Sequence, residues 1–203
     1  MKLLKKRNID WIFLIIGLLL LSMEIAKQYY LFFVYFDRHY NVWYFPFQLC
    51  SIPMYLCIVR FFLNERNYMK KECIDTFLQD FTLLGGIGAL AVPDGFIYPN
   101  HMFLTLHGYL WHVILILISV LMFYYRLADS SMRGFLKSLV VFLPSTVLAE
   151  VINVVLHPFG DCDMFYISPY HLSTQPILHW IDGQIGRTLG ILFYVILMFL
   201  EHI

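Results

Sequence analysis

The apolar run MFLTLHGYLWHVILILISVLMFYY, residues 102–125, decides the fold class of this chain. It contains no Asp, Glu, Lys or Arg, and it exceeds the roughly 20 residues that a helix needs to cross a bilayer. Of the 203 residues, 60% are hydrophobic and only 14% are charged, with a mean hydropathy of +0.70. This composition is too apolar for a soluble domain, so we expect an integral membrane protein.

Five further apolar stretches accompany this run. The six predicted membrane spans are residues 11–34, 43–63, 77–92, 102–125, 135–156 and 183–200. The third is the shortest, and its Gly85, Gly86 and Gly88 favour close helix contacts. Because no long linker separates the stretches, residues 1–203 are predicted to form one all-α domain, a polytopic bundle of six transmembrane helices.

The basic residues predict how these spans are oriented. They gather before the first span, after the second and between the fourth and fifth, at Lys2, Lys5, Lys6, Arg7, Arg66, Lys70, Lys71, Arg126, Arg133 and Lys137. By the positive-inside rule, both chain termini are therefore expected in the cytoplasm. The basic loops are interpreted as topology signals and not as a nucleic-acid-binding surface.

Cys50 and His107 are the residues with the clearest chemical potential. Counted along a helix at ~1.5 Å per residue, Cys50 lies about 10 Å below Trp43. By the same rise, His107 lies about 9 Å below His101. Both are expected in the outer third of a ~30 Å hydrocarbon core. Pro53 is expected to kink the second span beside Cys50, because proline cannot donate a backbone hydrogen bond.

Other polar residues are predicted to lie at a similar depth. In the fifth span they are spaced four, three and four apart and form one stripe, Thr146, Glu150, Asn153 and His157. An ionised side chain in lipid is costly unless it is paired. We therefore expect Glu150 to pair with Lys27 or Arg187 beneath an outward-facing polar cavity.

A thiol and an imidazole at one depth favour covalent lipid chemistry. His107 would accept the thiol proton, and the Cys50 thiolate would attack a lipid ester to form an acyl-thioester. Asn153, Gln48 or a backbone N–H would donate to the oxyanion. His112 is the alternative base, one helical turn further on.

Three short motifs, taken in order, resemble the YwaF-like integral membrane family. They are Pro-x-x-Leu-Cys at residues 46–50, Gly-Ala-Leu-x-x-Pro-Asp at residues 88–94, and Phe103 followed by His107-Gly108. The resemblance implies acyl transfer or ester hydrolysis, because that family includes a vertebrate acyltransferase of ether-phospholipid remodelling described as using a cysteine and a histidine. By motif position, Cys50 and His107 match those two residues.

The resemblance also implies a membrane phospholipid or another acyl lipid as substrate. Because the chain shares the compactness of bacterial members, a bacterial plasma membrane is the expected location. No cofactor or metal is predicted, and the pattern specifies no oligomeric state. The loop at residues 160–166 departs from the family's Gly-x-Asn-Tyr pattern, so substrate geometry near it is not carried over.

Two other functions remain open. The first is a metal-dependent membrane hydrolase that would use His101, His157, Asp161, Asp163, His171 and His179. Against it, the chain has no CxxC or HExxH motif, and these spacings fit no helical ligand pair. The second is a non-enzymatic lipid-binding or transport protein in which Glu150 and Arg187 line a polar route.

Overall fold

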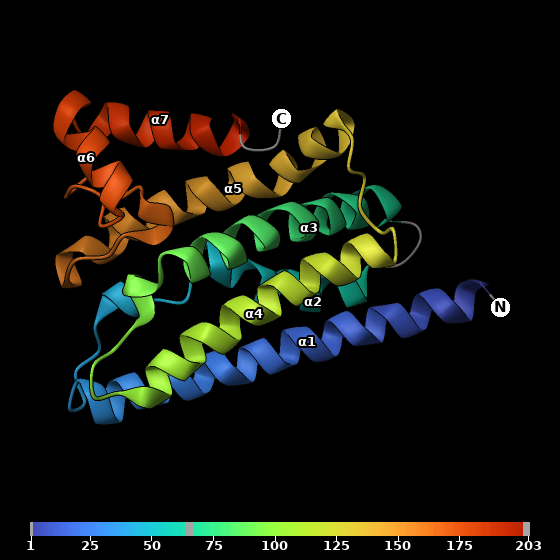
Figure 1. Cartoon of the computed structure of the whole chain (residues 1–203), viewed down its shortest axis with the longest axis horizontal. Coiled ribbons are helices and arrows are strands. Elements are labelled where there is room, and N and C mark those ends of the chain that lie inside the picture. The colour runs from blue at the N-terminus through green and yellow to red at the C-terminus, as the bar shows by residue number, and fades with distance from the viewer. Residues whose placement is uncertain (1, 64–66, 201–203) are drawn as a thin grey trace. The chain divides into compact units, whose positions relative to one another are not determined.

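Within residues 2–63 and 67–200, which the computed structural model describes, every regular element is helical (Figure 1). The α-helices are α1 (Lys2–Tyr30), α2 (Ile52–Phe62), α3 (Tyr68–Ala91), α4 (Met102–Tyr124), α5 (Met132–Leu156), α6 (Pro176–Ile185) and α7 (Arg187–Leu200). A π-helical turn, Leu31–Tyr35, extends α1, and short 3₁₀ turns join several of the others. The predicted all-α class is confirmed.

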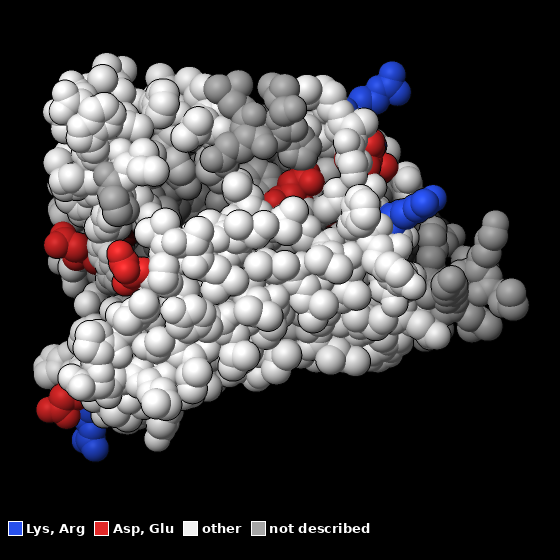
Figure 2. Space-filling model, viewed as in Figure 1, with Lys and Arg blue, Asp and Glu red and all other residues white. Residues whose placement is uncertain are grey.

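Three helical segments are long and apolar enough to cross a membrane, namely Asn8–Tyr35, Met102–Tyr124 and Met132–Phe159. Leu49–Phe62 and Arg187–Met198 are shorter apolar helices. In Figure 2 the surface over α1 and α4 carries almost no charged side chain, and exposed apolar residues such as Ile25 and Val113 account for it. These features describe a multi-pass membrane protein, whereas the full set of six spans stays a prediction.

The predicted second span is wrong in its first half. The segment preceding Cys50 is not α-helical, because Phe45, just before Pro46, has an extended backbone (φ −55°, ψ 132°), as the residue before a proline prefers. A 3₁₀ turn, Leu49–Ser51, then leads into α2. The depth of Cys50 counted at a continuous helical rise from residue 43 therefore does not apply.

Pro53 does not kink a helix as predicted. It lies in the first turn of α2, where its missing N–H is one of those that have no partner within the helix. Two other predicted boundaries also change. Helix α3 begins at Tyr68, well before residue 77, and the predicted last span is interrupted at Gly186, whose φ of 84° separates α6 from α7.

The chain divides into two compact units. Unit 1 comprises Met1–His39 and Leu49–Val141, and unit 2 comprises Tyr40–Gln48 and Phe142–Ile203. In unit 1, α1 packs along α2 and α3 packs along α4, while α1 also contacts α4 (Figure 1). One apolar core joins all four helices and includes Phe13, Leu20, Met54, Leu78, Leu115 and Ile118. The prediction of one domain is not tested by this division.

The glycines of α3 have different roles. A Cβ on Gly86 would lie 2.6 Å from Ile116 Cγ1 and 3.0 Å from the His112 carbonyl oxygen, so α3 approaches α4 closely there. Nothing lies within 4 Å of a Cβ built on Gly85 or Gly88. The predicted close helix contact is confirmed for Gly86 and wrong for the other two.

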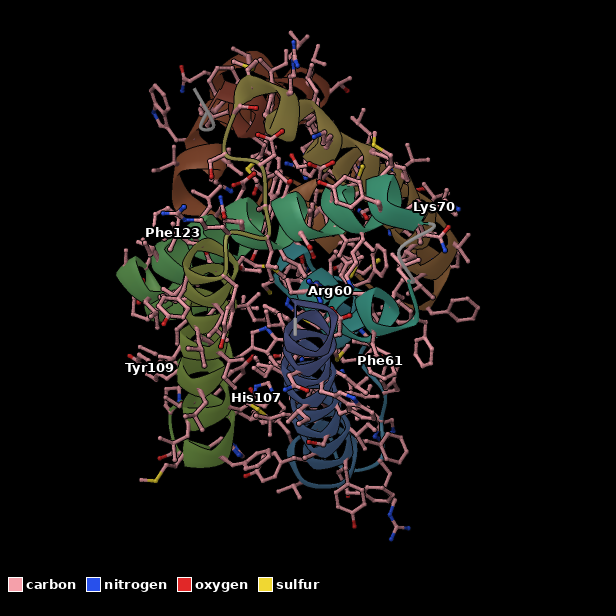
Figure 3. All side chains as sticks on the ribbon, turned by 90° about the vertical axis from the view of Figure 1, so that its right-hand side faces the viewer. Arg60, Phe61, Lys70, His107, Tyr109 and Phe123 are labelled. Atoms are coloured by element: carbon pink, nitrogen blue, oxygen red, sulfur yellow. The ribbon has the colours of Figure 1, made fainter. Side chains whose placement is uncertain are left out.

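A buried charge cluster joins α1, α2 and α3. Arg60 is only 1% exposed and donates to both carboxylate oxygens of Asp75 and to Asp10 (Figure 3). Lys71 also donates to Asp10 at 2.7 Å, and the guanidinium lies 4.7 Å from the centroid of the Phe13 ring. Since a buried cation needs matched partners, this cluster fastens three helices together.

Candidate functional site

Cys50 lies in the 3₁₀ turn that precedes α2, and its side chain is half-buried against the core of unit 1. The Ser51 side chain is a hydrogen-bond partner of the thiol. The carbonyl oxygen of Cys50 accepts a 3.0 Å hydrogen bond from Nε1 of Trp111 on α4. A residue 61 positions further along the chain thus holds the backbone at the thiol.

His107 projects from α4 toward α1, whereas Tyr109 projects away from α1 (Figure 3). The backbone of Met23 on α1 lies near the ring, and Nε2 is buried without a hydrogen-bond partner. In a neutral imidazole with its proton on Nδ1, Nε2 has the free lone pair of a proton acceptor.

The two predicted catalytic residues share a neighbourhood but no hydrogen bond. Since Nε2 of His107 has no partner, Cys50 Sγ does not bond to it in this structure. Trp111 contacts both residues, because its ring stacks on the His107 ring with centroids 5.4 Å apart while its N–H binds the Cys50 carbonyl. Catalytic hydrogen bonds are commonly long or absent in substrate-free enzymes.

Charged residues of α1 surround this site. Glu24 is 3% exposed, forms a 2.8 Å ion pair with Lys27 and accepts a 2.7 Å hydrogen bond from Gln28 Nε2. Both charges act electrostatically on Cys50 and His107. From the sequence, Lys27 is expected only as a partner of Glu150, and Glu24 and Gln28 are not assigned to the site. The signal available was a carboxylate and a cation three residues apart in an apolar span.

His112 has a different environment from His107. Its Nδ1 lies 2.8 Å from the Gly108 carbonyl oxygen of the same helix, and its ring stacks on Phe96 with centroids 4.9 Å apart. A Cβ on Gly108 would lie 2.5 Å from Phe96, so the glycine makes room for this ring. The Pro93–Phe96 turn therefore docks on the His107-Gly108 pair, which links two of the sequence motifs through packing.

The sequence model of the TMEM164 family matches residues 1–200, a range that includes every candidate site residue. The chain belongs to the TMEM164 family. No curated protein and no solved structure matches it. TMEM164 is a transmembrane-protein family, in agreement with the apolar helices of both units.

In unit 2 of this TMEM164-family chain, two amide side chains hold one loop. Gln48 donates to the Asp163 carbonyl at 2.8 Å and accepts from the Phe165 N–H at 2.9 Å. Asn153 donates to the Met164 carbonyl at 3.1 Å and accepts from its N–H at 2.7 Å. Both amides therefore support a turn in which Phe165 has a positive φ of 58°, and the oxyanion role predicted for them has no support in these contacts.

Arg187 supports the same part of the TMEM164-family fold. It donates to Asp182 at 2.6 Å and to the carbonyl oxygens of Ser168 and Tyr166 at 2.7 and 2.9 Å. The predicted pairing of Arg187 with Glu150 is thus replaced by a bond to Asp182.

The second predicted partner of Glu150 is also bound elsewhere, because Lys27 pairs with Glu24. Oε2 of Glu150 is buried without a hydrogen-bond partner, and its side chain is hydrogen-bonded to Asn153. Glu150 therefore belongs with the polar residues of unit 2, where Arg187 acts on it electrostatically but makes no ion pair with it.

The predicted metal ligands are not gathered in this TMEM164-family chain. Among the described residues, no three His, Cys, Asp or Glu side chains come together as a metal site. His157 stacks on Tyr170 at 3.7 Å between ring centroids, and His179 Nδ1 lies 2.9 Å from the Ser173 carbonyl oxygen. His171 Nε2 lies 3.3 Å from the Cys162 carbonyl oxygen.

Proposed function

We propose that this TMEM164-family protein is an integral membrane enzyme that transfers or hydrolyses the acyl groups of lipids, with Cys50 as nucleophile and His107 as base. The observation that carries this proposal is the state of the His107 ring. Its Nε2 is buried and unpartnered, and its ring stacks on Trp111, whose N–H binds the carbonyl oxygen of Cys50. A buried nitrogen without a partner is costly in a structural role but is what a general base requires.

The chemistry proceeds in two steps. Nε2 of His107 takes the thiol proton as Cys50 Sγ attacks the ester carbonyl carbon. The carbonyl oxygen of the ester then becomes the oxyanion of a tetrahedral intermediate. Collapse breaks the bond to the leaving alcohol, which takes the proton from His107 and departs as a lysolipid. Cys50 is then an acyl-thioester. A second lipid alcohol or water attacks its carbonyl carbon and loses its proton to His107. The C–S bond then breaks, the acyl group leaves on the attacking oxygen, and the Cys50 thiolate takes the proton back from His107.

The direct Sγ to Nε2 contact forms in this proposal only when substrate is bound. The approach required is to about 3 Å, as for other nucleophile and base pairs. Ser51, already hydrogen-bonded to the thiol, supports the thiolate during this approach. Because the charges of Glu24 and Lys27 are paired with each other, the site has no net charge that would exclude an acyl ester.

The membrane arrangement belongs to the same proposal. Six spans with both termini in the cytoplasm place the Cys50 turn in the outer half of a bacterial plasma membrane, in contact with phospholipid or another acyl lipid. The reaction as written uses no cofactor and no metal. The exposed apolar flanks of α1 and α4 give an acyl chain access to this region from the bilayer.

The test is lipid turnover by purified protein in liposomes that contain a phospholipid with a labelled acyl chain and an unlabelled lysophospholipid acceptor. Transfer of label to the acceptor indicates an acyltransferase, and release of free fatty acid indicates a hydrolase. Cys50→Ala should abolish both reactions, and Cys73→Ala is the matched control. Turnover that persists in Cys50→Ala overturns the proposal, as does turnover that chelation abolishes while Cys50→Ala leaves it intact.

A further inference from the structure

Trp111 contacts both members of the proposed catalytic pair. It follows His107 by four residues on α4, so both side chains lie on the same helix face. Its ring lies at 25° to the His107 ring with centroids 5.4 Å apart, and its Nε1 donates to the Cys50 carbonyl at 3.0 Å. The side chain is 4% exposed, so neither contact is an accident of a mobile surface residue.

The backbone explains why the Cys50 carbonyl needs this donor. Cys50 lies in a 3₁₀ turn, in which a carbonyl accepts from the N–H three residues further on. That position is Pro53, which has no N–H to give. A carbonyl deprived of this partner in an apolar region costs free energy unless another donor reaches it. The indole N–H of Trp111 supplies such a donor from a different helix.

We propose that Trp111 is a positioning residue of the Cys50–His107 site, which holds the Cys50 turn against the face of the base; the inference rests on the proposed function. The indole covers one face of the imidazole and so limits how the ring can turn. Nε2, which is buried and has no partner, is thereby held in one direction. The indole N–H sets the position of the Cys50 backbone relative to it.

A purely structural role for Trp111 makes a different prediction. Trp111 also belongs to the apolar core of unit 1, beside Met54 and Leu115. If packing were its whole role, a replacement that keeps an aromatic ring would leave the reactivity of Cys50 unchanged. Trp111→Phe keeps an aromatic ring and removes the N–H donor together with part of the indole volume, so the alkylation rate and the melting midpoint are measured side by side to separate the two roles.

The experiment measures the alkylation rate of Cys50 and needs no lipid substrate. The full-length protein carries Cys57→Ala, Cys73→Ala and Cys162→Ala, and a membrane-permeant iodoacetamide is applied between pH 6 and pH 10. Only the thiolate reacts, so a base that assists deprotonation raises the rate near neutral pH. The melting midpoint of each variant is followed in parallel, and Trp180→Phe, at an exposed position, is the matched control.

Trp111→Phe should lower the rate near neutral pH by about tenfold, which corresponds to about 1.4 kcal/mol. The melting midpoint should fall only modestly, because one carbonyl loses its donor. His107→Ala should lower it at least as much, and the double variant should lose no more than His107→Ala alone, because coupled residues are not additive. Trp111→Leu, which removes the ring as well, should behave like the double variant.

The outcomes separate this inference from the proposed function. A lower rate in His107→Ala, with Trp111→Phe equal to its parent at every pH, overturns the positioning role and leaves the catalytic pair standing. Equal rates in His107→Ala and its parent overturn the catalytic pair, and the positioning role with it. If the difference in alkylation rate between Trp111→Phe and its parent disappears when both are measured equally far below their melting midpoints, Trp111 is a packing residue.

Discussion

In unit 1, the buried polar groups around Arg60 and around His107 differ in how completely their atoms are paired. Around Arg60, the guanidinium meets both oxygens of Asp75 and one of Asp10, and Lys71 adds a second cation to Asp10. Around His107, the ring nitrogen Nε2 is buried without a hydrogen-bond partner. Buried ions stabilise a fold only when they are fully matched. A buried acceptor left open is therefore the better candidate for chemistry.

The largest expected effect concerns the open group. His107→Ala should lower lipid turnover by roughly 10²–10⁴-fold, the range that general bases contribute, with little change in the melting midpoint. His112→Ala is the parallel variant, and it should keep its turnover because the His112 ring is already committed to Phe96 and the Gly108 carbonyl. Full turnover in His107→Ala would contradict the assignment of His107 as the base.

A substitution in the paired cluster around Arg60 should instead lower the stability of the fold. Arg60→Ala should reduce stability by about 3–5 kcal/mol, because it leaves the Asp75 carboxylate buried without a cation. Thermal unfolding of detergent-solubilised protein measures this. Lys70→Ala, at an exposed position in α3, is the control and should stay within about 0.5 kcal/mol of the wild type. An unchanged melting midpoint in Arg60→Ala would show that the cluster does not fasten the helices.

A glycine next to the open group offers a finer test. Gly108→Ala places a methyl group 2.5 Å from Phe96 and should destabilise the protein by about 1–3 kcal/mol through overpacking. Gly88→Ala, which meets nothing within 4 Å, should be neutral or stabilise α3 by up to about 1 kcal/mol. Equal melting midpoints for the two variants would argue against the docking of the Pro93–Phe96 turn on α4.

The smallest effect is expected at Asp129, a partly exposed carboxylate of unit 1 that pairs with Lys137. Hydrogen bonds from Ser131 and Lys137 lower the pKa of Asp129 from 3.8 to about 2. A carboxyl group whose folded pKa is depressed stabilises the fold above its unfolded pKa, and this contribution is lost as the pH falls toward the folded value. The melting difference between wild type and Asp129→Asn should therefore be small at pH 7 and disappear between pH 4 and pH 2. A constant difference across that range would contradict the assigned hydrogen bonds.

Comparison with the sequence shows which inferences rest on local information. The apolar runs predicted an all-helical membrane protein, and α4 begins and ends within one residue of its predicted range. The second span failed because two prolines interrupt an apolar run whose composition still suggested one helix. Hydropathy averages over a window, whereas the backbone responds to single prolines.

The apolar runs are enough to predict a helical membrane protein with a cysteine and a histidine in apolar segments. Which polar atoms are paired becomes known only from the fold. It assigned Gln48, Asn153 and Arg187 to the support of one loop, matched Lys27 with Glu24, and brought Met23 and Trp111 to the candidate pair. The physical reason is the sequence distance over which each property is set. A membrane span follows from the composition of about 20 consecutive residues. A hydrogen bond instead requires two atoms within about 3 Å of each other, and these atoms come from distant parts of the chain.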